Sequence, residues 1–159
     1  MATQQVLWTP GTAVTFQDSG GTVAMALTNL AHQAGVFSAL WDRGAGSKPW
    51  WYRVRALLPM ESTGGVLGEW LEVYLATSSE NTNYDGIAVA AAALVTAQRP
   101  NLKYVGAVIL GATSVADAKL MRTFDVCIAE RYLLVGVWNN TAAEHLQNDA
   151  NASVITITP

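Results

Sequence analysis

Residues 50–58 read WWYRVRALL, a stretch in which apolar and charged side chains alternate. In an extended strand, successive side chains point to opposite faces of the sheet. The arginines mark one face, with Trp51 beside them, and we expect this face to lie outside. The opposite face is apolar and is predicted to face the core; it carries Trp50, Tyr52, Val54 and Ala56. This stretch therefore predicts a strand with one buried face.

A second stretch, residues 69–76, reads EWLEVYLA and alternates in the same way. Its aliphatic side chains are predicted to face the core, and Trp70, Glu72 and Tyr74 are predicted to face outward. We expect Glu72 to pair with Arg53 or Arg55 across neighbouring strands, because opposite charges stabilise such cross-strand pairs.

Further short segments rich in Val, Thr, Leu and aromatic residues follow the same pattern, with clusters of Gly, Pro, Asn, Asp and Ser between them. The chain as a whole predicts about nine or ten strands, at residues 6–8, 12–16, 22–30, 36–42, 50–58, 69–76, 102–110, 120–129, 132–138 and 154–158. Many short strands in a chain of this length are typical of an all-β antiparallel sandwich, and we expect one of the jelly-roll kind.

Two segments depart from the strand pattern. Residues 87–98 are rich in alanine and are followed by Pro100, which predicts a short helix; the alternative is an extended crossover between the sheets. Residues 1–10 are predicted to form an N-terminal arm or an edge strand. Residues 11–159 are then expected to form a single β-sandwich domain.

The chain has few charges, and its composition argues against several classes of partner. Only 13% of residues are charged, against roughly 25% in an average soluble domain, and the net charge is −3. Such an acidic chain without basic clusters is not expected to bind nucleic acid. No apolar run is long enough to span a membrane, and no signal peptide is recognisable. The single cysteine, Cys127, excludes an internal disulfide and fits folding in a reducing cytoplasm.

The residue types that carry catalysis are sparse and poorly spaced. His32 and His145 are read as surface or loop histidines, and no pair of His, Cys or carboxylate residues has metal-ligand spacing. The segment 44–48, GAGSK, lacks the spacing of a phosphate-binding loop and is interpreted as a turn. We therefore expect a protein that is not an enzyme and has no metal or cofactor.

Six tryptophans are the most informative residues for function. Three or four are expected to pack between the sheets, while tryptophan is enriched where protein surfaces meet. The residues predicted to contact another protein are Trp8, Trp51, Trp70 and Tyr74. Exposed aromatic residues on a sandwich could equally form a platform for stacking sugars, so a carbohydrate-binding module stays open as an alternative.

The second half of the chain resembles a known family in several phrases that occur in the same order. These are GEWLEVYLATS at 68–78, NLKYVG at 101–106, ERYL at 130–133, VWNNT at 137–141 and ITITP at 155–159. They are similar to segments of small tailed-bacteriophage capsid decoration, or cement, proteins with jelly-roll-like folds. The first half of the chain matches only loosely.

The resemblance implies a structural protein that acts without a cofactor. It would be made in the cytoplasm of the host bacterium and would bind the major capsid protein lattice on the exterior of the virion capsid. It would associate with itself as a dimer or trimer and stabilise the head by bridging coat subunits. The alternative function is a carbohydrate-binding jelly-roll module, such as a phage adhesin or knob.

Overall fold

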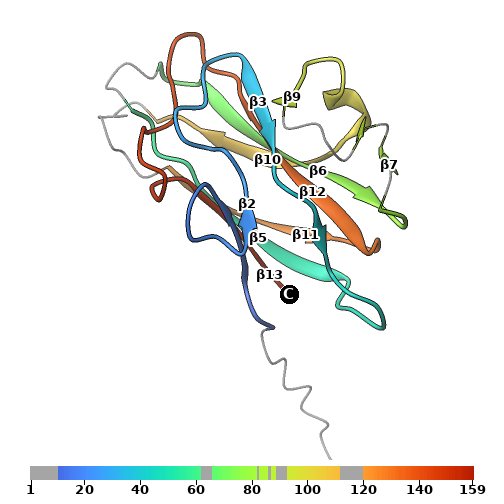
Figure 1. The fold of residues 1–159 in the computed structure, drawn as a ribbon. Helices are drawn as coiled ribbons and strands as arrows, with labels where there is room; N and C mark the ends of the chain where they lie inside the picture. Colours follow the sequence, from blue (N-terminus) through green and yellow to red (C-terminus); the bar gives the residue numbers. More distant parts are fainter. Residues whose placement is uncertain (1–10, 62–65, 82, 86, 89–92, 112–119) are drawn as a thin grey trace, which may run out of the picture.

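The computed structural model describes residues 11–61, 66–81, 83–85, 87–88, 93–111 and 120–159. Two large β-sheets packed face to face form most of the fold (Figure 1), and Asn83–Tyr84 pairs with Ile87–Ala88 as a separate two-stranded sheet. The five-stranded sheet has the order β11 (Met121–Cys127), β5 (Trp51–Leu57), β13 (Val154–Thr158), β1 (Val14–Gln17) and β2 (Val23–Ala24). The other has the order β10 (Lys103–Ile109), β6 (Trp70–Ser78), β12 (Tyr132–Asn139), β3 (Ala34–Phe37) and β9 (Ala93–Leu94), and β4 (Trp41–Asp42) also pairs with β12.

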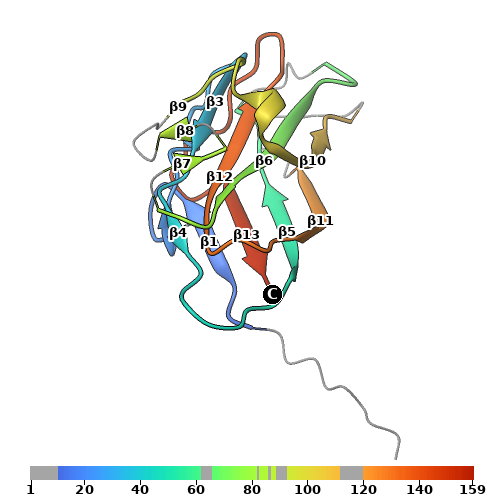
Figure 2. The ribbon, with the colours of Figure 1, turned by 90° about the vertical axis from the view of Figure 1, so that its right-hand side faces the viewer.

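Nearly all neighbouring strands are antiparallel, and the exception among the described pairs is β1 with β2, which run parallel. The predicted all-β antiparallel sandwich is confirmed. Figure 2 shows the chain turned so that β12 and β6 stand in front of β13 and β5.

The main core lies between the two sheets and is built from alternating side chains. In β5, Tyr52, Val54 and Ala56 are buried while Trp51 and the two arginines are exposed, as the alternation predicts. These buried residues belong to the same apolar cluster as Leu71, Val73 and Leu75 of β6. Burial of each such aliphatic side chain contributes about 1.5–3 kcal/mol, so this shared cluster holds the sheets together.

A second apolar cluster lies on the other face of the sheet that contains β6. The segment that covers this face carries β7 (Asn83–Tyr84), β8 (Ile87–Ala88), β9 and the 3₁₀ turn η1 (Arg99–Asn101). Figure 1 shows this segment on the side away from the five-stranded sheet. The cluster consists of Phe37, Tyr74, Ala76, Tyr84, Leu94, Leu102, Leu134 and Trp138. The prediction that Glu72 and Tyr74 face solvent is therefore wrong, because both are covered by this second layer.

The predicted helix at residues 87–98 is also wrong in the described part of the segment. Ile87–Ala88 and Ala93–Leu94 are strands, and β9 pairs with β3, so the extended alternative holds there. Leu94 packs against Gly35, where an added Cβ would lie 2.9 Å from the Leu94 Cβ atom. Close packing on the sheet thus outweighs the helix propensity of alanine, which is a weak preference. No helix in the described part of the chain is long and apolar enough to cross a membrane.

The edge strands of the two sheets meet at a glycine. Gly106 of β10 faces the ring of Phe124 of β11, and a Cβ atom added to Gly106 would lie 2.2 Å from Phe124 Cε1. The side of the sandwich at β10 and β11 can close only because residue 106 has no side chain.

We expect Gly106→Ala to lower the free energy of unfolding by roughly 1–3 kcal/mol, because the new methyl group must displace a packed aromatic ring. Urea denaturation measures this change. The matched control is Gly111→Ala, since a Cβ atom at Gly111 meets no described atom within 4 Å. Equal effects of the two substitutions would contradict the role assigned to Gly106.

Candidate functional site

A depression of about 210 Å³ lies between the loop that joins β4 to β5 and the turn that joins β11 to β12. Glycines 44 and 46 adopt positive φ angles of 82° and 90°, which lets the first loop turn sharply. We call this depression the Trp50 pocket, and the residues that line it include Gly44, Ser47, Lys48, Trp50, Ala129 and Arg131.

The buried side chain of Arg43 fixes the shape of the pocket. Its Nε and Nη2 atoms donate hydrogen bonds to the Tyr52 hydroxyl, at 3.0 and 2.7 Å. Nη1 donates to the carbonyl oxygens of Ile128, at 3.1 Å, and Glu130, and Nη2 also donates to that of Pro49, at 2.7 Å. A guanidinium group has five N–H donors, so Arg43 is fully occupied in joining both loops to β5.

Basic side chains line the pocket, and one of them is paired with a neighbouring acid. Arg131 Nε and Nη2 donate to the two carboxylate oxygens of Asp42, at 2.8 and 2.7 Å, and Gly44 N also donates to Asp42. The hydrogen bond from Arg131 lowers the pKa of Asp42 from its ordinary 3.8 to about 2. Arg131 therefore meets a full negative charge at neutral pH.

Trp50 forms part of the wall, and its position corrects a prediction. It was expected in the core, but 66% of its surface is exposed. The strand β5 begins at Trp51, and Trp50 lies just before it, where its carbonyl oxygen accepts a hydrogen bond from Ile128 N at 2.8 Å. Strand alternation therefore does not extend to Trp50. Pro49, directly before it, has no N–H to donate to a strand ladder and is the sequence signal for this boundary.

The residues predicted to contact a partner do not form one surface. Trp51 lies on the outer face of the five-stranded sheet and is 63% exposed, while Trp70 lies on the outer face of the other sheet and is 38% exposed. Tyr74 is only 6% exposed, so the prediction that it is an outward contact residue is wrong. Trp8 and the arm 1–10 lie outside the described residues, and those expectations stay predictions.

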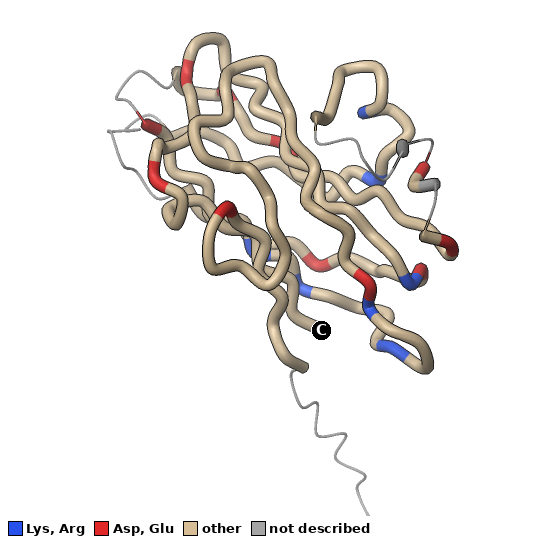
Figure 3. The backbone as a smooth tube through the Cα atoms, viewed as in Figure 1, with Lys and Arg blue, Asp and Glu red and all other residues tan. Residues whose placement is uncertain are grey.

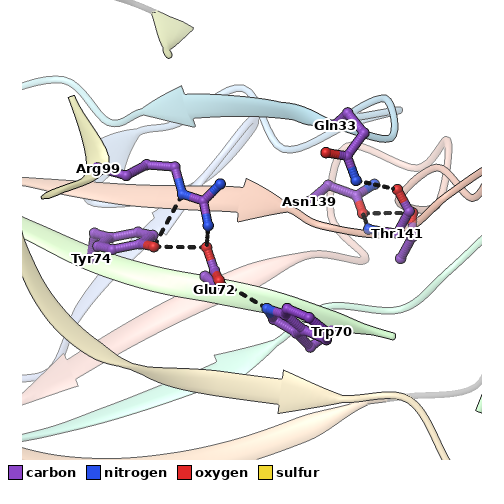
Figure 4. A network of polar contacts seen from close by, with 7 residues as sticks. All are labelled: Gln33, Trp70, Glu72, Tyr74, Arg99, Asn139 and Thr141. Atoms are coloured by element: carbon purple, nitrogen blue, oxygen red, sulfur yellow. Dashed lines mark hydrogen bonds and ion pairs between the residues drawn. The ribbon is translucent and has the colours of Figure 1, made fainter. Parts of the chain in front are cut away.

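A buried carboxylate holds Trp70 in place (Figure 4). Glu72 Oε1 accepts a hydrogen bond from the Trp70 indole N–H at 2.8 Å, and Oε2 accepts one from the Tyr74 hydroxyl at 2.7 Å. Glu72 also forms an ion pair with Arg99 of η1, rather than with Arg53 or Arg55 as predicted. This network ties the covering segment to β6 and leaves the ring of Trp70 as an apolar contact surface.

Two further exposed side chains extend this face along β10. Ile109 lies opposite Trp70 in the strand register, and Tyr104 lies opposite Tyr74 with their rings edge to face at 5.5 Å between centroids. Burial, followed by the hydrogen bond to Glu72, raises the pKa of Tyr74 above its ordinary value of 10. We call Trp70, Tyr104 and Ile109 the outer β10 patch.

The loops at the Trp70 end of the sandwich are held by a second polar cluster around Asn139, also drawn in Figure 4. The Asn139 side chain accepts from the amide and the hydroxyl of Thr141 and donates to the carbonyl oxygens of Leu30 and Glu144. Gln33 Nε2 donates to the Thr141 carbonyl oxygen at 2.9 Å. These bonds satisfy a fully buried amide and fix the loops on either side of it.

The two histidines lie side by side at this end of the molecule. Their rings stack with 5.7 Å between centroids, which brings together two residues that are far apart in the sequence. Among the described residues, no group of three or more His, Cys, Asp or Glu side chains is placed to hold a metal ion.

We expect the Asp42 carboxyl to titrate near pH 2 in the native protein, and Arg131→Gln to return its pKa toward 3.8. The ion pair stabilises the fold fully above the ordinary pKa of 3.8 and loses this effect as the pH falls toward about 2. A ¹³C NMR titration of side-chain carboxyls measures the pKa. Arg53→Gln is the control, because Arg53 pairs with Asp125 instead; a shift of Asp42 in that control, or none in Arg131→Gln, would contradict the assignment.

No protein-family model matches the sequence, and no curated protein matches it either. Among solved structures, the chain is similar to the C-terminal CBM6, a carbohydrate-binding module, of LamC, a marine laminarinase from Zobellia galactanivorans. The two share 9% sequence identity over 93% of this chain and 100% of that chain, with a TM-score of 0.49. A likeness at this level identifies neither a site nor a ligand.

Proposed function

We propose that the chain is a non-catalytic binding module and that its Trp50 pocket holds a carbohydrate. The observation that carries this proposal is a largely exposed tryptophan in the wall of a small polar depression. Exposure of the apolar face of an indole ring to water is energetically unfavourable, because burial of that face lowers the free energy. A ligand that covers Trp50 gains this burial.

The chemistry of the pocket fits a sugar ring. A sugar presents a face of C–H groups, which packs against an aromatic ring, and an edge of hydroxyl groups, which exchange hydrogen bonds. Trp50 provides the ring, while the Ser47 hydroxyl and the Lys48 ammonium provide polar groups beside it. Ligand sites commonly combine an apolar surface with a few placed polar groups of this kind.

The pocket is also held in shape before any ligand binds. Arg43 joins Pro49 to Ile128 and Glu130, and these residues flank the depression from both loops. A site that is already ordered loses less conformational entropy on binding. A small ligand with few contacts can therefore bind with useful affinity.

We expect Trp50→Ala to abolish glycan binding while Trp51→Ala retains it. Both residues are exposed tryptophans of nearly equal exposure, but only Trp50 lines the pocket and Trp51 lies on the outer face of β5. A glycan array probed with the wild-type chain and both variants measures this. Loss of binding in Trp51→Ala with retention in Trp50→Ala would place the site elsewhere, and no bound glycan with wild-type protein would reject the proposal.

A separate observation favours capsid decoration as a second candidate function. Trp51 and the outer β10 patch lie on opposite outer faces of the sandwich, so one copy can contact two partners at once. Only 13% of the residues of the whole chain are charged (Figure 3), although Arg53 and Arg55 share the outer face of β5 with Trp51. On a repeating coat lattice of a tailed-phage head, such two-sided contacts add up through multivalency.

For this second function we expect the purified chain to co-sediment with undecorated phage heads and to raise their temperature of thermal rupture. Trp51→Ala and Trp70→Ala should each weaken co-sedimentation, because each removes an apolar contact from one of the two faces. Trp50→Ala is the matched control and should decorate heads normally. An unchanged rupture temperature, together with a chain that stays in the supernatant, would reject capsid decoration.

A further inference from the structure

We infer that the sugar recognised by the Trp50 pocket is acidic, with a negatively charged group held by Lys48. This inference rests on the proposed carbohydrate function and specifies its ligand class. Its basis is the distribution of charge around the pocket.

The lining of the pocket is basic in a chain that is acidic overall. Three of the nine Lys and Arg residues line it, namely Arg43, Lys48 and Arg131, while none of the Asp and Glu residues in the described part of the chain does. A concave site lined by one sign of charge concentrates ligands of the opposite sign. The pocket therefore favours an anion although the net charge of the chain is −3.

Of these three cations, Lys48 has free donors to offer. All five donors of Arg43 are used within the protein, and Arg131 is bound by both carboxylate oxygens of Asp42. Lys48 makes no hydrogen bond or ion pair with any described residue, and its charge interacts with the nearby carboxylate of Asp42 through space. A lysine ammonium carries three donors, so a bound anion could accept from it directly.

The position of the ammonium group places this charge inside the site. Lys48 Nζ lies 3.3 Å from the point where a Cβ atom on Gly44 would stand, so it lies over the glycine loop that lines the pocket. The lysine side chain is half-buried, which weakens its screening by salt compared with a fully exposed charge. Trp50 lines the same depression, so a single sugar can contact both residues.

Two kinds of acidic sugar share the chemistry required here, which is a negatively charged oxygen group on the ring or its substituent. One kind carries a carboxylate and the other a phosphate or sulfate ester. Both accept charge-assisted hydrogen bonds from an ammonium group, which are about twice as strong as neutral ones.

The test is an array of matched glycan pairs: uronic-acid oligosaccharides beside their methyl esters, sialylated glycans beside desialylated ones, and phosphorylated or sulfated sugars beside unmodified ones. We expect binding to the charged member of a pair to exceed that to the neutral member by roughly tenfold, and to weaken as salt is added. The class of pair that responds identifies whether the anion is a carboxylate or an ester.

Variants separate this inference from the proposed function. Lys48→Gln should remove the preference for the acidic member, Lys48→Arg should restore it, and Arg122→Gln, which removes a charge from the far end of β11, should change nothing. If both members of every responding pair bind equally, and Lys48→Gln binds as the wild type does, the sugar is neutral and only this inference fails. If no sugar binds at all, the carbohydrate function itself is rejected.

Discussion

The guanidinium group of Arg43 is the contact on which the candidate site depends. Arg43 directly follows β4, which pairs with β12 of the sheet that contains β6. Its guanidinium group donates hydrogen bonds to Tyr52 of β5, in the five-stranded sheet. At the same time it binds the turn between β11 and β12. One buried cation thus joins the two sheets at this end, and its burial is tolerated because every donor has an acceptor. The pocket lies in the space that these contacts enclose.

The sequence predicts the sandwich well because alternation is a local property. The pattern in β5 follows from residues 51–57 alone, and the structure reproduces it residue by residue. The same reasoning fails for Glu72 and Tyr74, since their burial depends on η1 and β9, which come later in the chain. A glutamate such as Glu72 is predicted from the sequence to lie on the surface. Its partner Arg99 is distant in the sequence and is brought to it only by the fold. The prediction of a helix at 87–98 fails for the same reason, because Ala93–Leu94 pairs with β3, which is distant in sequence.

Strand alternation predicts only part of the candidate site. Trp51 and Trp70 were correctly placed outside, since each begins a strand with a clear inner face. Alternation predicts Trp50 in the core, and this prediction fails because Trp50 lies one residue before β5 begins. The turn at 44–48 was identified as a turn, but its partnership with residues 128–131 is a tertiary contact between distant loops. Spacing within a sequence cannot reveal a pocket that two such loops form together.

The acceptors that Arg43 uses in the two loops are main-chain carbonyl oxygens, which every amino acid supplies. Substitutions at Ile128, Glu130 and Pro49 can therefore leave the polar frame intact, provided that the backbone path is kept. Ser47 and Lys48 line the pocket without taking part in that frame. Ligand preference and structural integrity are thus encoded at different positions, so relatives of this chain could diverge in what they recognise while their loops superimpose.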